Sequence, residues 1–171
     1  QKVNYEIASS ICGKKVEKAN PTQLSKAIKN PVELENIRRA HIKDGVAFTK
    51  FMYWLKTNVG KIPMTEISAS DYLLARRAEQ EGFIEPSFDT ISAYKANAAM
   101  MHYSATEESN AVLKPEGMLL VDSGGQYYEG TTDITRTMVL GPITEEQKLH
   151  FTTVLRSNLN LANAQFLHGC I

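Results

Sequence analysis

The sequence predicts an α+β fold in which helices pack against a mixed or antiparallel sheet. Apolar residues recur at helical spacing from residue 31 to about residue 59, and a second helical stretch runs from Thr144 to about Leu167. Between them lie short apolar runs bounded by glycine, proline and polar residues, which are typical of strands. The order of helices, then strands, then one helix favours this class.

The composition indicates one globular domain with a real core. The chain has 171 residues, of which 43% are apolar and 22% charged. Nineteen basic residues balance nineteen acidic ones, so nothing indicates a nucleic-acid or anionic membrane partner. Cys12 and Cys170 have no metal or redox spacing, and we interpret them as reduced thiols of a cytosolic protein. Because the chain begins with Gln1 and ends soon after a helix, we expect it to be a fragment.

Weak local structure is predicted before residue 30. Loose alternation of apolar residues predicts a short strand over residues 3–11, and Val16 starts a second one. The Asn20-Pro21 turn leads into a short helix over residues 23–28.

The clearest prediction is the helix that follows. Asn30 caps it, Pro31 fits its first turn, and Glu33 suits the positive end of its dipole. Gly45 costs about 1 kcal/mol against alanine in mid-helix, which predicts close packing at that point. The residues at helical spacing are interpreted as core: Leu34, Ile37, His41, Phe48, Phe51, Met52 and Leu55.

Trp54 is assigned to packing or an interface rather than to chemistry. Residues 65–67 lead into a second helix over residues 70–80, with Ser70 as its cap and Gly82 at its end.

The second half of the chain predicts strands and a final helix. Residues 88–94 form a strand, residues 104–110 a polar loop, and residues 114–117 a β-turn that feeds the next strand. Thr144 and Gln147 form a capping box at the start of the last helix.

The stretch from residue 118 to residue 140 organises the chain. An apolar run ends in Asp122, a turn follows at Glu129-Gly130, and Asp133 lies in a threonine-rich return strand. We interpret this stretch as a β-hairpin with one carboxylate on each arm. A carboxylate at the end of a buried strand needs a cation or strong hydrogen-bond donors. Oxygen ligands alone suit a divalent ion such as manganese.

Spacing by itself favours a structural interpretation of both acids. Asp122 would cap a turn, and Asp133 would pair with Arg136. With a turn at Glu129-Gly130 the acids are not directly opposed, so a shared metal site requires a bulge at Gly124-Gly125.

His102 is the remaining candidate for chemistry. The pattern around it favours a half-buried imidazole with satisfied hydrogen bonds, and the alternative is a donor to a substrate carbonyl near the metal site. The motifs of serine hydrolases, P-loop proteins, dinucleotide-binding folds and HExxH metalloproteases are absent from the sequence. The other histidines receive structural roles: His41, His150 and His168.

Several linked motifs resemble one family. The run VDSGGQYYEGTTDITRT resembles the metal-binding hairpin of the pita-bread metallopeptidases, and most closely that of the aminopeptidase P (Xaa-Pro aminopeptidase) group. NPVELENIRRAHIKDGVAFTKFMYWL is similar to the helix that opens the catalytic domain of that family. EPSFDTISAY and MMHYSATEESN resemble the strand and histidine segment before the hairpin. The resemblance covers essentially the whole chain and reverses the structural interpretation of Asp122 and Asp133.

The resemblance implies a partial pita-bread fold and an incomplete site. Residues 1–171 would be part of a catalytic metallopeptidase domain, without the amino-terminal domains and the carboxy-terminal part. Two divalent ions, manganese first and zinc or cobalt as alternatives, would be held by five residues, of which only Asp122 and Asp133 lie in this chain. His102 would contact substrate, and Thr135 would hydrogen-bond a ligand carboxylate. The groups that handle protons lie beyond this chain, so it holds no catalytic residue.

The implied activity is a metal-dependent exopeptidase that removes the amino-terminal residue before a proline. The nucleophile would be a water activated by two metal ions, and the fragment alone would be inactive. A cytoplasmic homodimer acting on Xaa-Pro peptides, with no nucleic-acid or membrane partner, is the expected setting. The alternatives are a non-catalytic protein-binding module and a prolidase-type dipeptidase. Lys95 and Ala98 replace glycines of the family pattern, which affects the placement of His102.

Overall fold

The computed structural model describes residues 3–16, 18–167 and 169. His168 and Cys170, both interpreted above, lie outside the described residues. The chain divides into two compact units, Gln1–Glu35 and Asn36–Ile171.

The first unit contains two short helices, α1 (Tyr5–Ser10) and α2 (Pro21–Ala27). The strand predicted over residues 3–11 is therefore wrong. The Asn4 side chain accepts hydrogen bonds from the main-chain N–H groups of Glu6 and Ile7 and starts a helix instead. The strand predicted at Val16 is also not formed.

The long helix is confirmed as α3 (Pro31–Asn58). Asn30 and Glu33 form a reciprocal cap, with the Glu33 N–H donating to Asn30 Oδ1 at 2.9 Å. Leu34 and His41 are exposed, so the predicted apolar stripe was wrong at these two positions. The buried residues of α3 are Ala40, Asp44, Ala47, Phe48, Phe51 and Leu55.

The second long helix, α4 (Glu66–Ala78), begins earlier than predicted. Thr65, not Ser70, is its cap, because Thr65 Oγ1 accepts from the Ser68 N–H and Ser68 Oγ accepts from the Thr65 N–H. Ser70 lies inside the helix.

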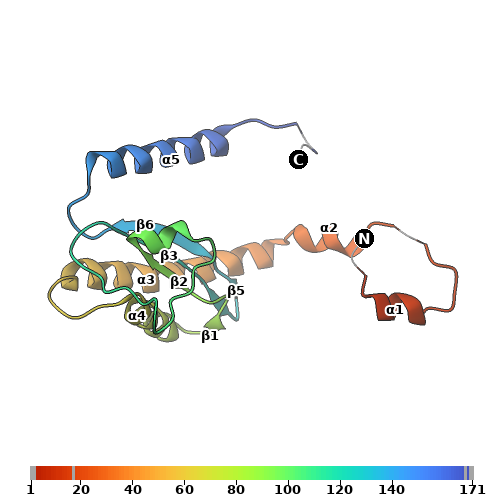
Figure 1. Ribbon diagram of the computed structural model, residues 1–171. Coiled ribbons are helices and arrows are strands. Elements are labelled where there is room, and N and C mark those ends of the chain that lie inside the picture. Colours follow the sequence, from red (N-terminus) through yellow and green to blue (C-terminus); the bar gives the residue numbers. More distant parts are fainter. Residues whose placement is uncertain (1–2, 17, 168, 170–171) are drawn as a thin grey trace. The chain divides into compact units, whose positions relative to one another are not determined.

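All paired strands are antiparallel and form two three-stranded sheets (Figure 1). The first, in the order β1-β4-β5, consists of β1 (Phe83–Pro86), β4 (Gly125–Tyr127) and β5 (Gly130–Thr131). The second, in the order β2-β3-β6, consists of β2 (Ile91–Tyr94), β3 (Met118–Ser123) and β6 (Ile134–Val139). The predicted strand over residues 88–94 is shorter than expected, and β1 was not predicted.

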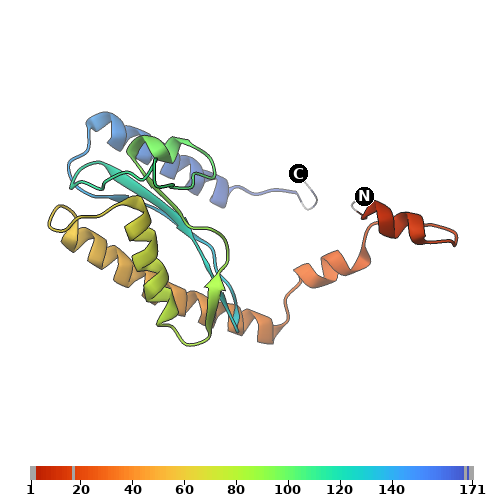
Figure 2. The ribbon, with the colours of Figure 1, turned by 60° about the horizontal axis from the view of Figure 1, so that its bottom comes forward.

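Helices α3 and α4 lie along one face of the β2-β3-β6 sheet (Figure 2). Phe51 and Leu55 of α3 and Leu73 of α4 are fully buried against Leu119 and Val121 of β3. This segregated packing of helices on an antiparallel sheet confirms the α+β prediction.

The connection from β2 to β3 contains the short 3-10 helix η1 (Lys95–Ala99), followed by the loop that carries His102. The last helix is α5 (Glu145–Asn163), and Thr144 and Gln147 form the predicted capping box. Within the residues described, none of the helices is apolar over a stretch sufficient to cross a membrane.

Candidate metal centre

The face from which Asp122 projects is set by the alternation along β3. Leu119, Val121 and Ser123 are buried toward the helices, whereas Leu120 and Asp122 are only partly buried. Because successive side chains of a strand point to opposite faces, Asp122 lies on the face that α3 and α4 leave uncovered.

The hairpin keeps one register from end to end. Ser123 pairs with Ile134 and Gln126 pairs with Thr131, which leaves two residues on each strand between these pairs. The predicted bulge at Gly124-Gly125 is therefore wrong, and the turn lies at residues 128–129.

The pairing continues through a very crowded point at Gly124. A Cβ atom on Gly124 would lie 2.0 Å from the Thr132 carbonyl oxygen and 2.2 Å from Ser87 Oγ. Ser87 itself donates to that Thr132 carbonyl at 2.9 Å. Only glycine fits here, so the strands approach closely where the two acids lie.

One oxygen of Asp122 is held by a neighbour. Asp122 pairs with Thr135 across the strands, and Thr135 Oγ1 donates to Asp122 Oδ1 at 2.7 Å. A hydrogen bond from Thr135 to a ligand carboxylate was predicted from the sequence. The hydrogen bond to Asp122 is formed, and the role of Asp122 as a metal ligand stays a prediction. Asp122 Oδ2 has no hydrogen-bond partner among the described residues, so it is available to a ligand.

Asp133 is exposed and stands immediately before β6. Within the described part of the chain its carboxylate makes no hydrogen bond or ion pair, and Arg136 donates to the Thr135 carbonyl at 2.8 Å instead. The structural alternative, in which Asp133 pairs with Arg136, is thus not formed. The register sets Asp133 diagonally across the hairpin from Asp122, because Thr135 is the direct partner of Asp122.

His102 has an unusual backbone. Its φ is +54°, its side chain is exposed, and it has no hydrogen-bond partner among the residues described. The predicted half-buried, satisfied imidazole is wrong. Lys95 also has a positive φ, +50°. Glycine adopts this backbone conformation readily, which fits the glycine that the family pattern has at this position.

A shallow hollow of about 470 Å³ lies on the uncovered face of β3. Met118 and Leu120 line it from β3 and Thr137 from β6, together with Lys95, Ala96, Ala98 and Gln147. Asp122, Asp133 and His102 are not among its lining residues, and no group of three or more His, Cys, Asp or Glu side chains in the described chain is placed to hold a metal ion. Among the described residues, Asp122 and Asp133 are therefore not part of a group of three or more such side chains.

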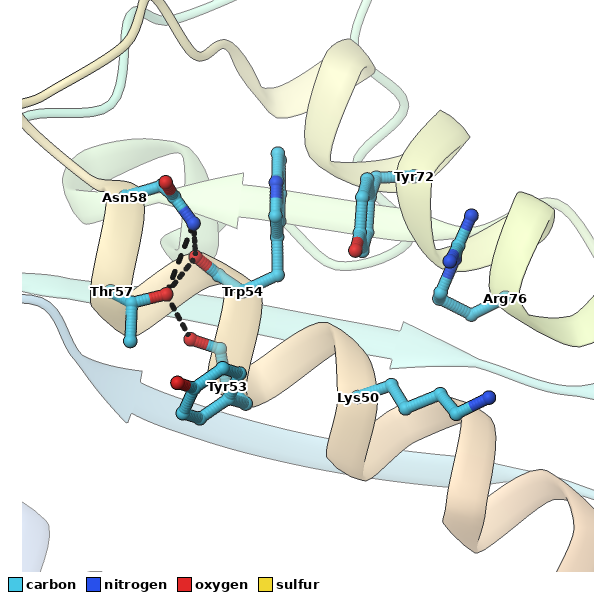
Figure 3. A pocket seen from close by; sticks show the side chains of 7 residues that line it. All are labelled: Lys50, Tyr53, Trp54, Thr57, Asn58, Tyr72 and Arg76. Carbon is cyan, nitrogen blue, oxygen red and sulfur yellow. Dashed lines mark hydrogen bonds between the residues drawn. The ribbon is translucent and has the colours of Figure 1, made fainter.

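A second concavity of about 280 Å³ lies between α3 and α4 (Figure 3). Trp54 and Tyr72 stack there with ring centroids 3.8 Å apart, and the Arg76 guanidinium lies 4.7 Å from the Tyr72 ring centroid (Figure 3). This stack joins the two helices, as expected for a packing role of Trp54.

Two buried polar networks were missed from the sequence. Asp44 of α3 forms a two-point ion pair with Arg77 of α4, at 2.6 and 3.2 Å, and accepts from the Tyr127 hydroxyl at 2.9 Å. Burial raises the pKa of Tyr127, so its hydroxyl stays protonated as the donor. Glu66 is the centre of the second network. For the first network, the sequence contained one indication: Asp44 is an acidic residue among the apolar residues that α3 buries, and a buried acid needs a partner.

Residues 35–169 match the family model described as Metallopeptidase family M24. A probable Xaa-Pro aminopeptidase P of Paracoccidioides brasiliensis (strain Pb03) is 40% identical over 172 residues, covering 98% of this chain and 28% of the relative. Aminopeptidase P1 of Arabidopsis thaliana is 37% identical, covering 96% of this chain and 29% of the relative. The chain thus spans less than a third of the length of these relatives.

Solved structures have the same fold. An X-prolyl aminopeptidase from Caenorhabditis elegans, described as a cytosolic enzyme with a di-nuclear active site, has a TM-score of 0.81 and 37% identity over 86% of this chain and 24% of that one. An Xaa-Pro dipeptidase from Bacillus anthracis has a TM-score of 0.75 over 92% of this chain and 43% of that one, and its 24% identity supports the fold alone.

Proposed function

Because this chain belongs to metallopeptidase family M24 and has the pita-bread fold of its structural neighbours, we propose that it is part of the catalytic domain of a Xaa-Pro aminopeptidase. The whole protein would remove the amino-terminal residue from peptides with proline in second position. The observation that carries this proposal is the pair of acids on one hairpin, Asp122 and Asp133, both with carboxylate oxygens free of other partners among the described residues.

In this proposal Asp122 and Asp133 hold two divalent metal ions, with manganese as the first candidate and zinc or cobalt as alternatives. When bound, the ions would supply a water activated near neutral pH. The chemistry of the donor set fits, because carboxylate oxygens are ligands that hard or borderline divalent ions prefer. The remaining ligands and the proton-handling groups would come from further chain of the full-length protein.

Two other side chains have supporting roles in this proposal. Thr135 would fix the orientation of the Asp122 carboxylate through its 2.7 Å hydrogen bond. His102 would donate a hydrogen bond to the substrate near the scissile bond, since its exposed imidazole has no other partner among the described residues.

Removal of the Asp133 carboxylate tests the metal assignment. In the full-length protein, Asp133→Ala should abolish turnover of an Xaa-Pro tripeptide and lower the bound metal measured by elemental analysis. Asp71→Ala on the exposed face of α4 is the matched control and should change neither. Retained metal and turnover in Asp133→Ala would refute the assignment.

The isolated chain should be inactive, because it supplies only part of the ligand set. Calorimetric titration of the chain with manganese should show weak binding or none, and the tripeptide should not be hydrolysed. Tight manganese binding by the chain alone would contradict this expectation.

A prolidase-type dipeptidase is the second candidate, favoured by the fold similarity to the B. anthracis Xaa-Pro dipeptidase. A panel of Xaa-Pro dipeptides and tripeptides separates the two activities, since we expect the full-length protein to cleave both lengths. Cleavage of dipeptides only would favour the prolidase. A non-catalytic binding module would cleave neither. We further propose that the full-length protein is cytoplasmic and forms a homodimer. Sedimentation of the purified protein tests the homodimer, and fractionation of cells tests the location.

A further inference from the structure

The segment that carries His102 is hydrogen-bonded to a buried carboxylate of α4, that of Glu66. Glu66 is the first residue of α4 and is fully buried. It accepts main-chain hydrogen bonds from the N–H of Tyr94 at 2.6 Å and from the N–H of Ala111 at 3.0 Å. Tyr94 is the last residue of β2, and Ala111 follows the loop that carries His102, so Glu66 holds the chain on both sides of that loop.

Side chains on both sides of His102 reach the same carboxylate. The Tyr103 hydroxyl donates to Glu66 Oε2 at 2.7 Å, and Asn97 Nδ2 donates to Oε1 at 3.0 Å. Asn97 also donates to the Tyr103 hydroxyl oxygen at 3.0 Å, which closes the network. Burial raises the pKa of Tyr103, so its hydroxyl keeps the proton that it donates.

The donors converge on a group that can only accept. A carboxylate offers two oxygens with about four lone-pair sites, which matches the four donor groups around Glu66. An amide in its place would turn an N–H₂ group toward other donors and leave buried groups unpaired. The environment thus calls for a side chain that accepts hydrogen bonds through two oxygens at this position.

The held segment has a backbone that needs such support. Lys95 and His102 have φ values of +50° and +54°, which side-chain-bearing residues adopt only when their surroundings impose it. The donors to Glu66 at Tyr94, Asn97 and Tyr103 stand next to or close to these two positions.

We propose that Glu66 is a positioning residue that fixes the His102 segment so that the imidazole is presented to the peptide substrate. The inference rests on the proposed function, because it requires His102 to contact substrate. Glu66 acts through Asn97 and Tyr103 and does not touch the substrate itself.

The test compares two buried tyrosines that differ in what they hold. Tyr103→Phe removes the hydroxyl that donates to Glu66, and Tyr127→Phe removes the hydroxyl that donates to Asp44, far along the chain from His102. In the full-length protein, Tyr103→Phe should lower kcat/KM for an Xaa-Pro tripeptide by about tenfold without loss of bound metal, because misplacement of a group that positions the substrate is costly. Tyr127→Phe should leave kcat/KM within about twofold of the wild-type value. The phenylalanine ring keeps the packing of Tyr127, and the lost hydroxyl donates to Asp44 and not to the network around His102.

A double-mutant cycle decides whether the effect passes through His102. In a His102→Ala background, Tyr103→Phe should cause little further loss of kcat/KM. An equal loss in both backgrounds would overturn the inference, as would a His102→Ala variant with unchanged kcat/KM.

A measurement without activity separates this inference from the proposed function. Hydrogen exchange over residues 95–105 should become faster in Tyr103→Phe and stay unchanged in Tyr127→Phe. Unchanged exchange in Tyr103→Phe overturns the role of Glu66. Faster exchange in a full-length protein that cleaves no Xaa-Pro peptide supports the hold of Glu66 on the segment and refutes the proposed peptidase instead.

Discussion

At the scale of single residues, Thr135 and Gly124 determine how the hairpin holds the carboxylates of Asp122 and Asp133. Thr135 directly opposes Asp122 and donates to one of its oxygens, and no described residue donates a hydrogen bond to the other oxygen. Gly124 permits the close approach of the strands beside them, since its Cβ would meet the Thr132 carbonyl. The local geometry thus provides a carboxylate already oriented for a ligand.

Thr135→Val should weaken metal binding without removing a ligand. The isosteric change deletes the hydroxyl that holds Asp122, and loss of such a partner typically costs about 10- to 100-fold in metal affinity. Competition with a chelator in the full-length protein measures the change. Thr137→Val, two residues along the same strand face, is the control and should bind metal normally. An unaltered affinity in Thr135→Val would show that the hydrogen bond is irrelevant to the site.

At the scale of elements, α3 contains a glycine that its packing does not explain. A Cβ atom on Gly45 would meet no atom of the described residues within 4 Å, so the close packing predicted there is not found among them. Gly45→Ala should raise the free energy of unfolding of the chain by about 0.4–1 kcal/mol, because alanine restricts the unfolded chain and favours the helix.

Urea denaturation measures this gain. Gly124→Ala provides the contrast and should destabilise strongly, since its Cβ would lie 2.0 Å from the Thr132 carbonyl oxygen. A destabilised Gly45→Ala variant would mean that an unseen contact occupies the space beside α3.

The tip of the hairpin is tied to α3 by an ion pair between Lys43 and Glu129. The hydrogen bond from Lys43 holds the pKa of Glu129 below its ordinary value of 4.5. A carboxyl with a lowered pKa in the folded state stabilises the fold above its unfolded pKa, and the stabilisation is lost as the pH falls through the folded pKa.

Unfolding free energy should therefore decline below about pH 4.5, and Glu129→Gln should flatten that decline. Denaturant unfolding between pH 3 and 7 gives the comparison. If the unfolding free energy of Glu129→Gln declines below pH 4.5 as steeply as that of the unchanged protein, Glu129 does not contribute to the acid sensitivity.

At the scale of the whole molecule, the sequence predicted what local patterns determine. The caps at Asn30 and Thr144, the long helix and the antiparallel hairpin were all predicted, because their signals lie within a few residues of one another. The first strand was wrong since Asn4 provides a helix cap that the alternation of apolar residues hides.

Long-range contacts escaped prediction from the sequence. The ion pair of Asp44 with Arg77 joins residues of two helices, and the donors to Glu66 come from three separate segments. Such pairs depend on how the elements pack, and the local sequence around one member does not identify its partner. Asp122 and Asp133, the proposed metal ligands, were singled out through resemblance, because spacing alone favoured a structural role.

We propose that Asp122 and Asp133 bind the same pair of divalent ions. Anomalous diffraction at the manganese edge from crystals of the full-length, manganese-loaded protein can locate those ions. Two neighbouring anomalous peaks are expected, with carboxylate oxygens of both aspartates as ligands. Peaks remote from the hairpin, or ions coordinated by neither aspartate, would contradict it.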